Sequence, residues 1–395
     1  MTTRLRRAIG WLHLWIGLLL SLPLVLLGLS GSILVFEDEL RGLFDPLAHR
    51  VATPGEARPV AEIIAAARAA GPAGLAPVFY AAPAAGESLA TVRLAQASRG
   101  VAGPGASPLR IRVDPVTLQA FPDAEGDGFL RWLASLHASA LVPGGTGRTL
   151  IGWLGVAMLA LGVSGLVNWW PRPGRWRRAF SVRRGARGVL LQRDLHAAVG
   201  IWGAAVLLVV SASGVYLAFP AAIRTAVDSV LPVRDFRASL ISARVEPVKG
   251  ATPMTVDGAI ALARTAVPTA RLGFVFLPAR PDQPFRVTLQ PPRAAHGAPA
   301  ITVVVDPWTH GIDRIVDPRD FNAAETALAW QRALHAGEGF GWIWKILVAL
   351  AGLLPLVFAA TGIAFWWQKR RAARRQAPRP GRVLEEVYST GGADE

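Results

Sequence analysis

The chain has 395 residues, of which 52% are apolar and 17% are charged, and it contains no cysteine. A water-soluble globule of this composition would have difficulty hiding its hydrophobic surface, so we expect a membrane protein. The absence of cysteine excludes disulfides, thiolate-bound iron–sulfur clusters, zinc knuckles and covalent haem attachment through C-x-x-C-H. Any metal chemistry must therefore rest on histidine, on carboxylates or, less favourably, on one of the three methionines.

Four segments are long and apolar enough to cross a membrane, since about 20 residues span its hydrocarbon core. They are residues 9–36, 148–170, 195–219 and 341–367. The first is expected to be a retained helix and not a cleaved signal peptide, because its apolar run is too long and no small-residue cleavage site follows it.

The formal charge of +15 is gathered in short stretches that flank these spans. Arginine and lysine cluster before the first span, in the loop 171–194 and at the start of the tail 368–395. Positive charge in such flanks marks the cytoplasmic side, so both termini are expected in the cytoplasm and the long connections outside. We therefore expect membrane lipid, and not nucleic acid, beside the basic residues. The tail has too little apolar content for a core and is expected to be disordered.

The first and third spans match each other without a gap, which indicates a duplication. His13 and His196 each precede a glycine by four residues, a Ser-Gly pair by 17 and a phenylalanine by 23. The second and fourth spans match with one residue of slip, from His137 and His335 to "SGLVNWW" and "TGIAFWW". The predicted fold class is an integral membrane α-helical protein, with four transmembrane helices in two duplicated halves related by an axis along the membrane normal.

The connections outside the membrane predict two small α+β domains, at residues 37–126 and 220–321. Each contains one segment with helical periodicity, "RPVAEIIAAARAAG" or "MTVDGAIALARTAV", the latter opening with a threonine cap candidate. Strand-like segments follow: "APVFYAA", "SLATVRLA" and "LRIRVD" in the first, and "RLGFVFLP", "PFRVTLQ" and "AITVVVD" in the second. Residues 127–147 and 322–340 then predict short interfacial helices that lead into the second and fourth spans.

Four of the seven histidines occupy equivalent places in the two halves: His13 with His196, and His137 with His335. A lone histidine at membrane depth usually bonds a backbone carbonyl or stacks at the interface, but four copies at duplicated positions favour a cofactor. Two histidines facing each other across a pseudo-twofold axis suit the two axial positions of a haem iron. Without C-x-x-C-H such a haem is non-covalent, hence b-type. A zinc or copper site at one pair would lack its third and fourth ligands.

Three cations near these histidines could bind haem propionates. Arg148 and Lys345 follow the outer histidines at equivalent positions, and Arg193 lies just before His196. A cation at the end of a span can equally be an interface anchor. Asp194, beside His196, could orient an imidazole N–H or cap the third span.

The assembled segments resemble the PepSY-associated transmembrane family of bacterial iron-regulated inner-membrane proteins. The resemblance rests on "LHLWIGL", "GRTLIGWLGVAMLALGVSGLVNWWPR", "DLHAAVGIW", "LHAGEGFG" and "GLLPLVFAATGIAFWW", and it covers the chain to about Arg371. It implies that the outer domains are periplasmic PepSY modules. It also implies a siderophore-iron reductase with His13, His137, His196 and His335 as haem ligands. Lys345 stands where the family tends to have arginine, which weakens a bidentate propionate contact.

Together these expectations predict a reductase with two b-type haems, which passes electrons across the membrane to a ferric siderophore and releases ferrous iron. No G-x-G-x-x-G opens a helix after a strand, so the electron donor is expected to be a cytoplasmic reductase or a quinol. Two rival classes stay open. One is a regulatory or binding protein that acts through its PepSY domains, with structural histidines. The other is a transporter of iron or siderophore, for which Pro23 and Pro355 are the only hints of broken helices.

Overall fold

The computed structural model describes residues 2–45, 47, 49–84, 86–96, 108–122 and 128–376. The chain divides into two compact units, which are described separately. Unit 1 comprises Met1–Leu29, Leu154–Ser211 and Leu350–Glu395, and unit 2 comprises Ser30–Trp153 and Ala212–Ala349.

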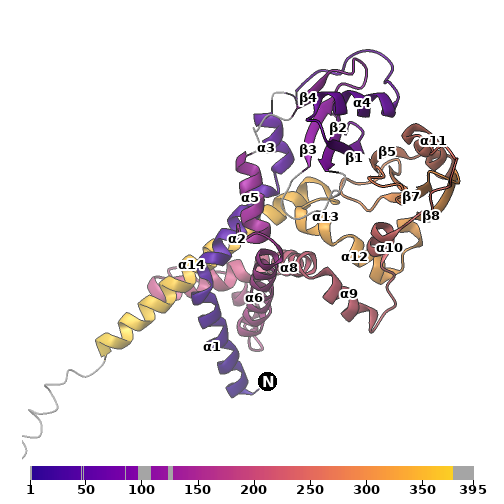
Figure 1. Ribbon diagram of the computed structural model, residues 1–395. Helices are drawn as coiled ribbons and strands as arrows, with labels where there is room; N and C mark the ends of the chain where they lie inside the picture. Colours follow the sequence, from indigo (N-terminus) through magenta and orange to yellow (C-terminus); the bar gives the residue numbers. More distant parts are fainter. Residues whose placement is uncertain are drawn as a thin grey trace, which may run out of the picture. The chain divides into compact units, whose positions relative to one another are not determined.

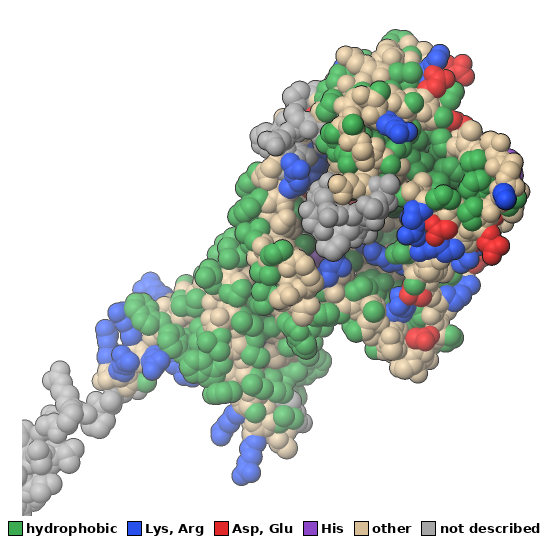
Figure 2. Space-filling model, in the orientation of Figure 1, with side chains coloured by type: hydrophobic (Ala, Val, Ile, Leu, Met, Phe, Trp, Pro, Cys, Tyr) green, Lys and Arg blue, Asp and Glu red, His purple; other side chains and the backbone are tan. Residues whose placement is uncertain are grey.

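Three helices are long and apolar enough to cross a membrane (Figure 1): α6 (Gly145–Trp169), α8 (Gly188–Ala218) and α14 (Gly341–Gln376). A fourth span exists if α1 (Thr3–Leu19) and α2 (Ser21–Leu34) are counted together. Figure 2 shows hydrophobic side chains, in green, over the exposed surface of these helices. Large apolar residues stay exposed on all of them, among them Leu19, Trp153, Trp202 and Ile343. Lipid is the solvent that such a surface requires.

The first span is not the single continuous helix expected for residues 9–36. The axes of α1 and α2 differ by 69° across a break at Leu20. Pro23 explains the position of this break, because its ring clashes with the carbonyl four residues earlier, at Leu19, where α1 ends. The Ser21 hydroxyl donates to the Leu18 carbonyl at 2.9 Å and satisfies one acceptor at the broken end. Pro355, by contrast, lies inside α14 without ending it.

Several boundaries differ from those predicted. The helix α8 begins at Gly188, inside the expected loop 171–194, which also holds the short α7 (Trp176–Ala179). The helix α14 continues to Gln376, so the start of the expected disordered tail is helical, and residues 377–395 lie outside the described residues. The interfacial helix near 127–147 is α5 (Gly128–Ser139), whereas the one near 322–340 is two short helices, α12 (Ala323–Ala329) and α13 (Gln331–Ala336).

The strands of unit 2 form one antiparallel eight-stranded sheet in the order β4-β3-β2-β1-β5-β6-β7-β8. The first outer segment contributes β1 (Leu75–Ala81), β2 (Ala90–Gln96), β3 (Leu109–Val113) and β4 (Ala120–Pro122). The second contributes β5 (Arg271–Phe276), β6 (Phe285–Gln290), β7 (Ile301–Asp306) and β8 (Gly311–Val316). The expectation of two separate sheets is therefore corrected. Each of β1 and β5 alone would be an unpaired edge, and their pairing, with Tyr80 opposite Val275, satisfies both.

Two helices cover this sheet and share its core. They are α4 (Val60–Ala70) and α11 (Val256–Ala266), which contact the strands and each other. Val92 and Val287, from the two outer segments, are completely buried in one hydrophobic cluster. The expected threonine cap is present, since the Thr255 side chain accepts a hydrogen bond from the Gly258 amide.

Three further helices of unit 2 have no counterpart in the sequence-based expectations. They are α3 (Glu37–Phe44), which follows α2, and α9 (Pro220–Asp228) and α10 (Phe236–Ser242), which follow α8. Their apolar periodicity is too short to separate them from loops.

Candidate functional site

The first histidine pair lies in unit 1, where α1 carries His13 and α8 carries His196. The two ring centroids are 6.2 Å apart, and the ring planes stand at 79° to each other. The Phe358 ring of α14 lies 5.0 Å from that of His196. Leu24, Met158 and Leu207 form a buried cluster in the same unit, against which Phe358 packs. The pair therefore lies among apolar side chains between helices.

The second pair lies in unit 2, with His137 on α5 and His335 on α13. Its ring centroids are 6.0 Å apart and its ring planes are inclined by 45°. The structure thus brings His13 next to His196 and His137 next to His335.

Both spacings suit two imidazoles on opposite sides of one metal ion. A metal–imidazole nitrogen bond is about 2.0 Å long, and the ring centroid lies about 1.1 Å beyond the nitrogen, so two opposed ligands place their centroids about 6.3 Å apart. The observed 6.2 and 6.0 Å are close to this value. Among the described residues, no group of three or more histidine or carboxylate side chains could hold a metal ion by itself. Each pair accordingly offers two ligands, the number that a six-coordinate haem iron with two protein ligands requires.

Every one of the four rings has its Nδ1 atom at hydrogen-bond distance from a hydroxyl on a spanning helix. In unit 1, His13 Nδ1 lies 2.8 Å from Ser164 Oγ on α6, and His196 Nδ1 lies 2.9 Å from Thr361 Oγ1 on α14. In unit 2, His137 Nδ1 lies 3.1 Å from Ser30 Oγ, and His335 Nδ1 lies 3.2 Å from Ser213 Oγ. The orientation of each ring is therefore set by a contact at Nδ1 and not at Nε2.

A glycine follows each of these hydroxyl residues and faces the same ring. A Cβ atom at Gly31 would lie 2.8 Å from His137 Cε1, and one at Gly214 would lie 3.0 Å from His335 Cε1. At Gly165 and Gly362 the corresponding distances, to His13 and His196, are 3.4 and 3.7 Å. The rings of His137 and His335 thus sit at positions that a larger residue would obstruct, whereas those of His13 and His196 have ordinary clearance.

Sequence reasoning missed the four hydroxyls as partners of the histidines. It used the Ser-Gly pairs after His13 and His196 only as markers of the repeat. The available signal was the recurrence of Ser-Gly or Thr-Gly once in each span, at 30–31, 164–165, 213–214 and 361–362.

The three cations proposed for haem propionates are placed differently from one another. Arg148 is exposed at the start of α6. Lys345 forms an ion pair with Glu39 of α3 and lies near the Phe36 and Trp342 rings. Burial raises the pKa of the Glu39 carboxyl, but the hydrogen bond and charge of Lys345 outweigh it and leave this pKa below its usual value.

Arg193 lies beside Asp194, with 3.3 Å between its Nη2 and the carboxylate. Asp194 also accepts hydrogen bonds from Arg183 Nε and Nη2, at 2.6 and 2.9 Å. Because His196 Nδ1 is held by Thr361 and α8 begins well before Asp194, both expected roles of this aspartate were wrong. It fixes the arginine-rich loop to α8 instead.

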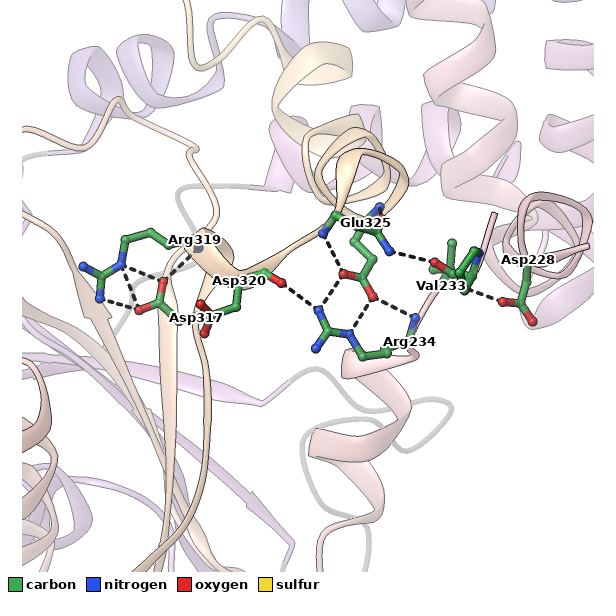
Figure 3. Close-up of polar contacts among 9 residues, drawn as sticks. Asp228, Val233, Arg234, Asp317, Arg319, Asp320 and Glu325 are labelled. Atoms are coloured by element: carbon green, nitrogen blue, oxygen red, sulfur yellow. Dashed lines mark hydrogen bonds and ion pairs between the residues drawn. The ribbon is translucent and has the colours of Figure 1, made fainter. Parts of the chain in front are cut away.

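The short helix α13, which carries His335, is tied to the rest of unit 2 through the preceding α12. Glu325 on α12 is buried and accepts hydrogen bonds from Arg234 Nε and Nη2, both at 2.7 Å (Figure 3). Glu325 also closes a capping box with Asn322. The Arg234 hydrogen bond is the largest cause of a lowered Glu325 pKa, about 2. This carboxylate therefore stays charged and bonded under physiological conditions.

A cavity of about 420 Å³ opens in unit 2 at the end of α13. Its wall includes Gly337, two residues after His335, together with Lys345 and Trp342. Asp38, Glu39 and Glu338 add carboxylates, and His296 adds an imidazole. Charged and apolar side chains thus line a hollow beside the helix that supplies one histidine of the pair.

The family model described as the PepSY-associated TM region matches residues 10–369 of the chain. A search of the curated proteins finds no match.

Proposed function

Because the chain belongs to the PepSY-associated transmembrane family, we propose that it is a haem-containing inner-membrane reductase that passes electrons to ferric siderophore iron in the periplasm. The observation that carries the proposal is the presence of two histidine pairs, each at the spacing of two axial ligands of one metal. Either pair alone would suit a haem protein confined to one side of the membrane. Two pairs, one in each unit, suit a chain of two electron carriers.

We assign one b-type haem to each pair, with His13 and His196 holding the inner one and His137 and His335 the outer one. Bound there, haem would supply reversible one-electron transfer, a chemistry that the side chains of this cysteine-free chain do not supply by themselves. The surrounding residues present the imidazoles and keep them in an apolar setting, which controls potential and access of water. Arg148, Lys345 and Arg193 remain the candidates for propionate contacts; for Lys345 this requires sharing with Glu39.

The assignment of sides rests on charge. Arg4, Arg6 and Arg7 on α1 and the basic loop before α8 flank the helix ends that carry His13 and His196. This distribution supports a cytoplasmic location for both termini and for the basic loop. The sheet and the outer pair, which share unit 2, are then periplasmic. The electron donor is a quinol or a cytoplasmic reductase.

The substrate reaction needs one electron for each iron and no proton transfer by the protein. Ferric iron bound by hard oxygen ligands becomes ferrous iron, which those ligands hold less tightly, so the metal leaves and the siderophore is unchanged. The cavity beside α13 is where we place the chelate, because its wall reaches within two residues of His335. Its carboxylates favour a chelate without excess negative charge.

The proposal is tested with the full-length protein in lipid vesicles, supplied with a reduced quinol and a ferric hydroxamate siderophore. Ferrous iron is trapped by a coloured chelator that cannot enter the vesicles. We expect ferrous iron to form at a rate that depends on the protein and falls to background in His196→Ala and in His335→Ala. Background rates with the haem-loaded wild-type protein would contradict the proposal.

The break between α1 and α2 favours one rival, since transporters commonly use discontinuous helices. A transporter would accumulate the intact ferric siderophore inside vesicles of the right orientation, without producing ferrous iron. Following a siderophore labelled in its organic part separates the two functions, because a reductase leaves that label outside.

A further inference from the structure

We infer that Ser30, Ser164, Ser213 and Thr361 are positioning residues whose hydroxyls accept the Nδ1–H of the four histidines and so turn each Nε2 toward a haem iron. The inference rests on the proposed haem sites and concerns how the protein prepares its ligands. It starts from the observation that all four rings meet a hydroxyl at Nδ1, at 2.8 to 3.2 Å.

The direction of the hydrogen bonds follows from the inner pair. The Ser164 hydroxyl donates to the Leu161 carbonyl at 3.2 Å, and the Thr361 hydroxyl donates to the Val357 carbonyl at 2.7 Å. A hydroxyl has one hydrogen, so towards the ring its oxygen can only accept. The neutral imidazole then carries its proton on Nδ1, and Nε2 has the lone pair that a metal requires.

The same arrangement in unit 2 assigns the same roles to Ser30 and Ser213. There the glycine after each hydroxyl adds a steric condition. A side chain at Gly31 or Gly214 would press on the Cε1 atom of the ring, next to both nitrogens. In each Ser-Gly pair the serine bonds Nδ1 of the ring, and the glycine, which has no side chain, leaves space for the ring.

Removing a hydroxyl has two expected effects. The ring loses the partner that fixes its orientation, and comparable outer-sphere substitutions lower metal affinity about 10- to 100-fold. The imidazole also becomes a weaker electron donor once the hydroxyl no longer accepts its Nδ1–H, so the ferric state is less stabilised and the midpoint potential of that haem rises.

The test uses the full chain purified from haem-replete cells. Haem content, the rate of haem transfer to excess apomyoglobin and the midpoint potential are measured for Ser164→Ala and Thr361→Ala. We expect faster transfer and a higher potential for the inner haem only, and a return to wild-type values in Thr361→Ser. The matched controls are Ser32→Ala, which removes a buried hydroxyl bonded to the Ala349 carbonyl at 2.7 Å, and Ser211→Ala, at another buried serine of α8.

The glycines give an independent arm. Gly31→Ala and Gly214→Ala should lose the outer haem, whereas Gly165→Ala and Gly362→Ala should keep the inner one, because their Cβ atoms have ordinary clearance. Hydroxyl variants that match the two controls, or four glycine variants that behave alike, would overturn the inference. In that case the histidine variants still lose haem and the proposed function survives. A wild-type protein without haem would overturn both.

Discussion

At the scale of single residues, the two histidine pairs differ most in the angle between their rings. The inner planes stand at 79° and the outer planes at 45°. Nearly perpendicular axial imidazoles leave two iron d orbitals almost equal in energy, and this makes the magnetic response of ferric low-spin iron more anisotropic. We expect two low-spin signals in the electron paramagnetic resonance spectrum, of which the more anisotropic is lost in His13→Ala. Loss of the less anisotropic signal in that variant would contradict the ring geometry.

The four histidines could be selected from the sequence because they recur at equivalent positions in a chain that otherwise has only three. Their partners could not be selected in the same way. A serine or threonine inside an apolar span commonly bonds the carbonyl three or four residues earlier, as Ser164 and Thr361 do. Only the packing of one helix against another shows that the same oxygen also meets an imidazole.

At the scale of elements, the contact between Arg234 and Glu325 holds the short helices α12 and α13. Glu325 is buried, so Arg234→Ala leaves a carboxylate without its charged partner. We expect this variant to have a lower melting temperature in detergent and to lose the outer haem before the inner one. Arg314→Ala is the matched control, since Arg314 pairs with Asp313 and both side chains of that pair are exposed. Equal effects of the two substitutions would contradict the role given to Arg234.

The same carboxylate predicts a pH dependence. The folded pKa of Glu325 is about 2, below its ordinary value of 4.5. A lowered pKa stabilises the fold fully above the ordinary value, and this stabilisation is lost as the pH falls from about 4.5 towards 2. The difference in melting temperature between wild type and Glu325→Gln should therefore be constant at pH 6 and above and should shrink towards pH 3. A difference that does not change over this range would show that the charge of Glu325 is not what stabilises α12.

The element boundaries also show where local reasoning stops. Pro23 and Pro355 look alike in the sequence, yet only the first ends a helix. The carbonyl freed by Pro23 is at Leu19, where α1 can end because Ser21 caps Leu18. The helix α14 continues through Pro355, and at this place it packs closely against another helix: Gly28 of α2 approaches the Gly352 carbonyl. Local sequence does not show such packing.

At the scale of the whole molecule, the outer segments are joined into one sheet through β1 and β5. Val275 is completely buried on β5 and faces Tyr80 across this junction. Val275→Pro removes a ladder hydrogen bond in a central strand, and the buried group left without its partner should cost about 1–3 kcal/mol. Because the sheet is shared, limited proteolysis should then cut both outer segments, 37–126 and 220–321, at the same rate.

The control is Asp313→Pro, on the edge strand β8 at the irregularity in its pairing with β7, where proline is tolerated. Cleavage confined to residues 220–321 in Val275→Pro would indicate two independent domains.

The sequence predicted six of the eight strands but not that they form one sheet, because strand pairing between distant segments leaves no periodic signal. The strands β4 and β8 were missed because they are short or polar, at the two edges of the sheet.

The central claim is that each histidine pair holds one haem, and absorption spectroscopy tests it most directly. The full-length protein, purified in detergent from haem-replete cells, is measured oxidised and dithionite-reduced, with haem quantified as the pyridine haemochrome. We predict a six-coordinate low-spin b-type spectrum with about two haems per chain, and the loss of about half of the haem in His196→Ala and of the other half in His335→Ala. A colourless wild-type protein would contradict the claim and leave the two rival functions, a binding role of the eight-stranded sheet and transport.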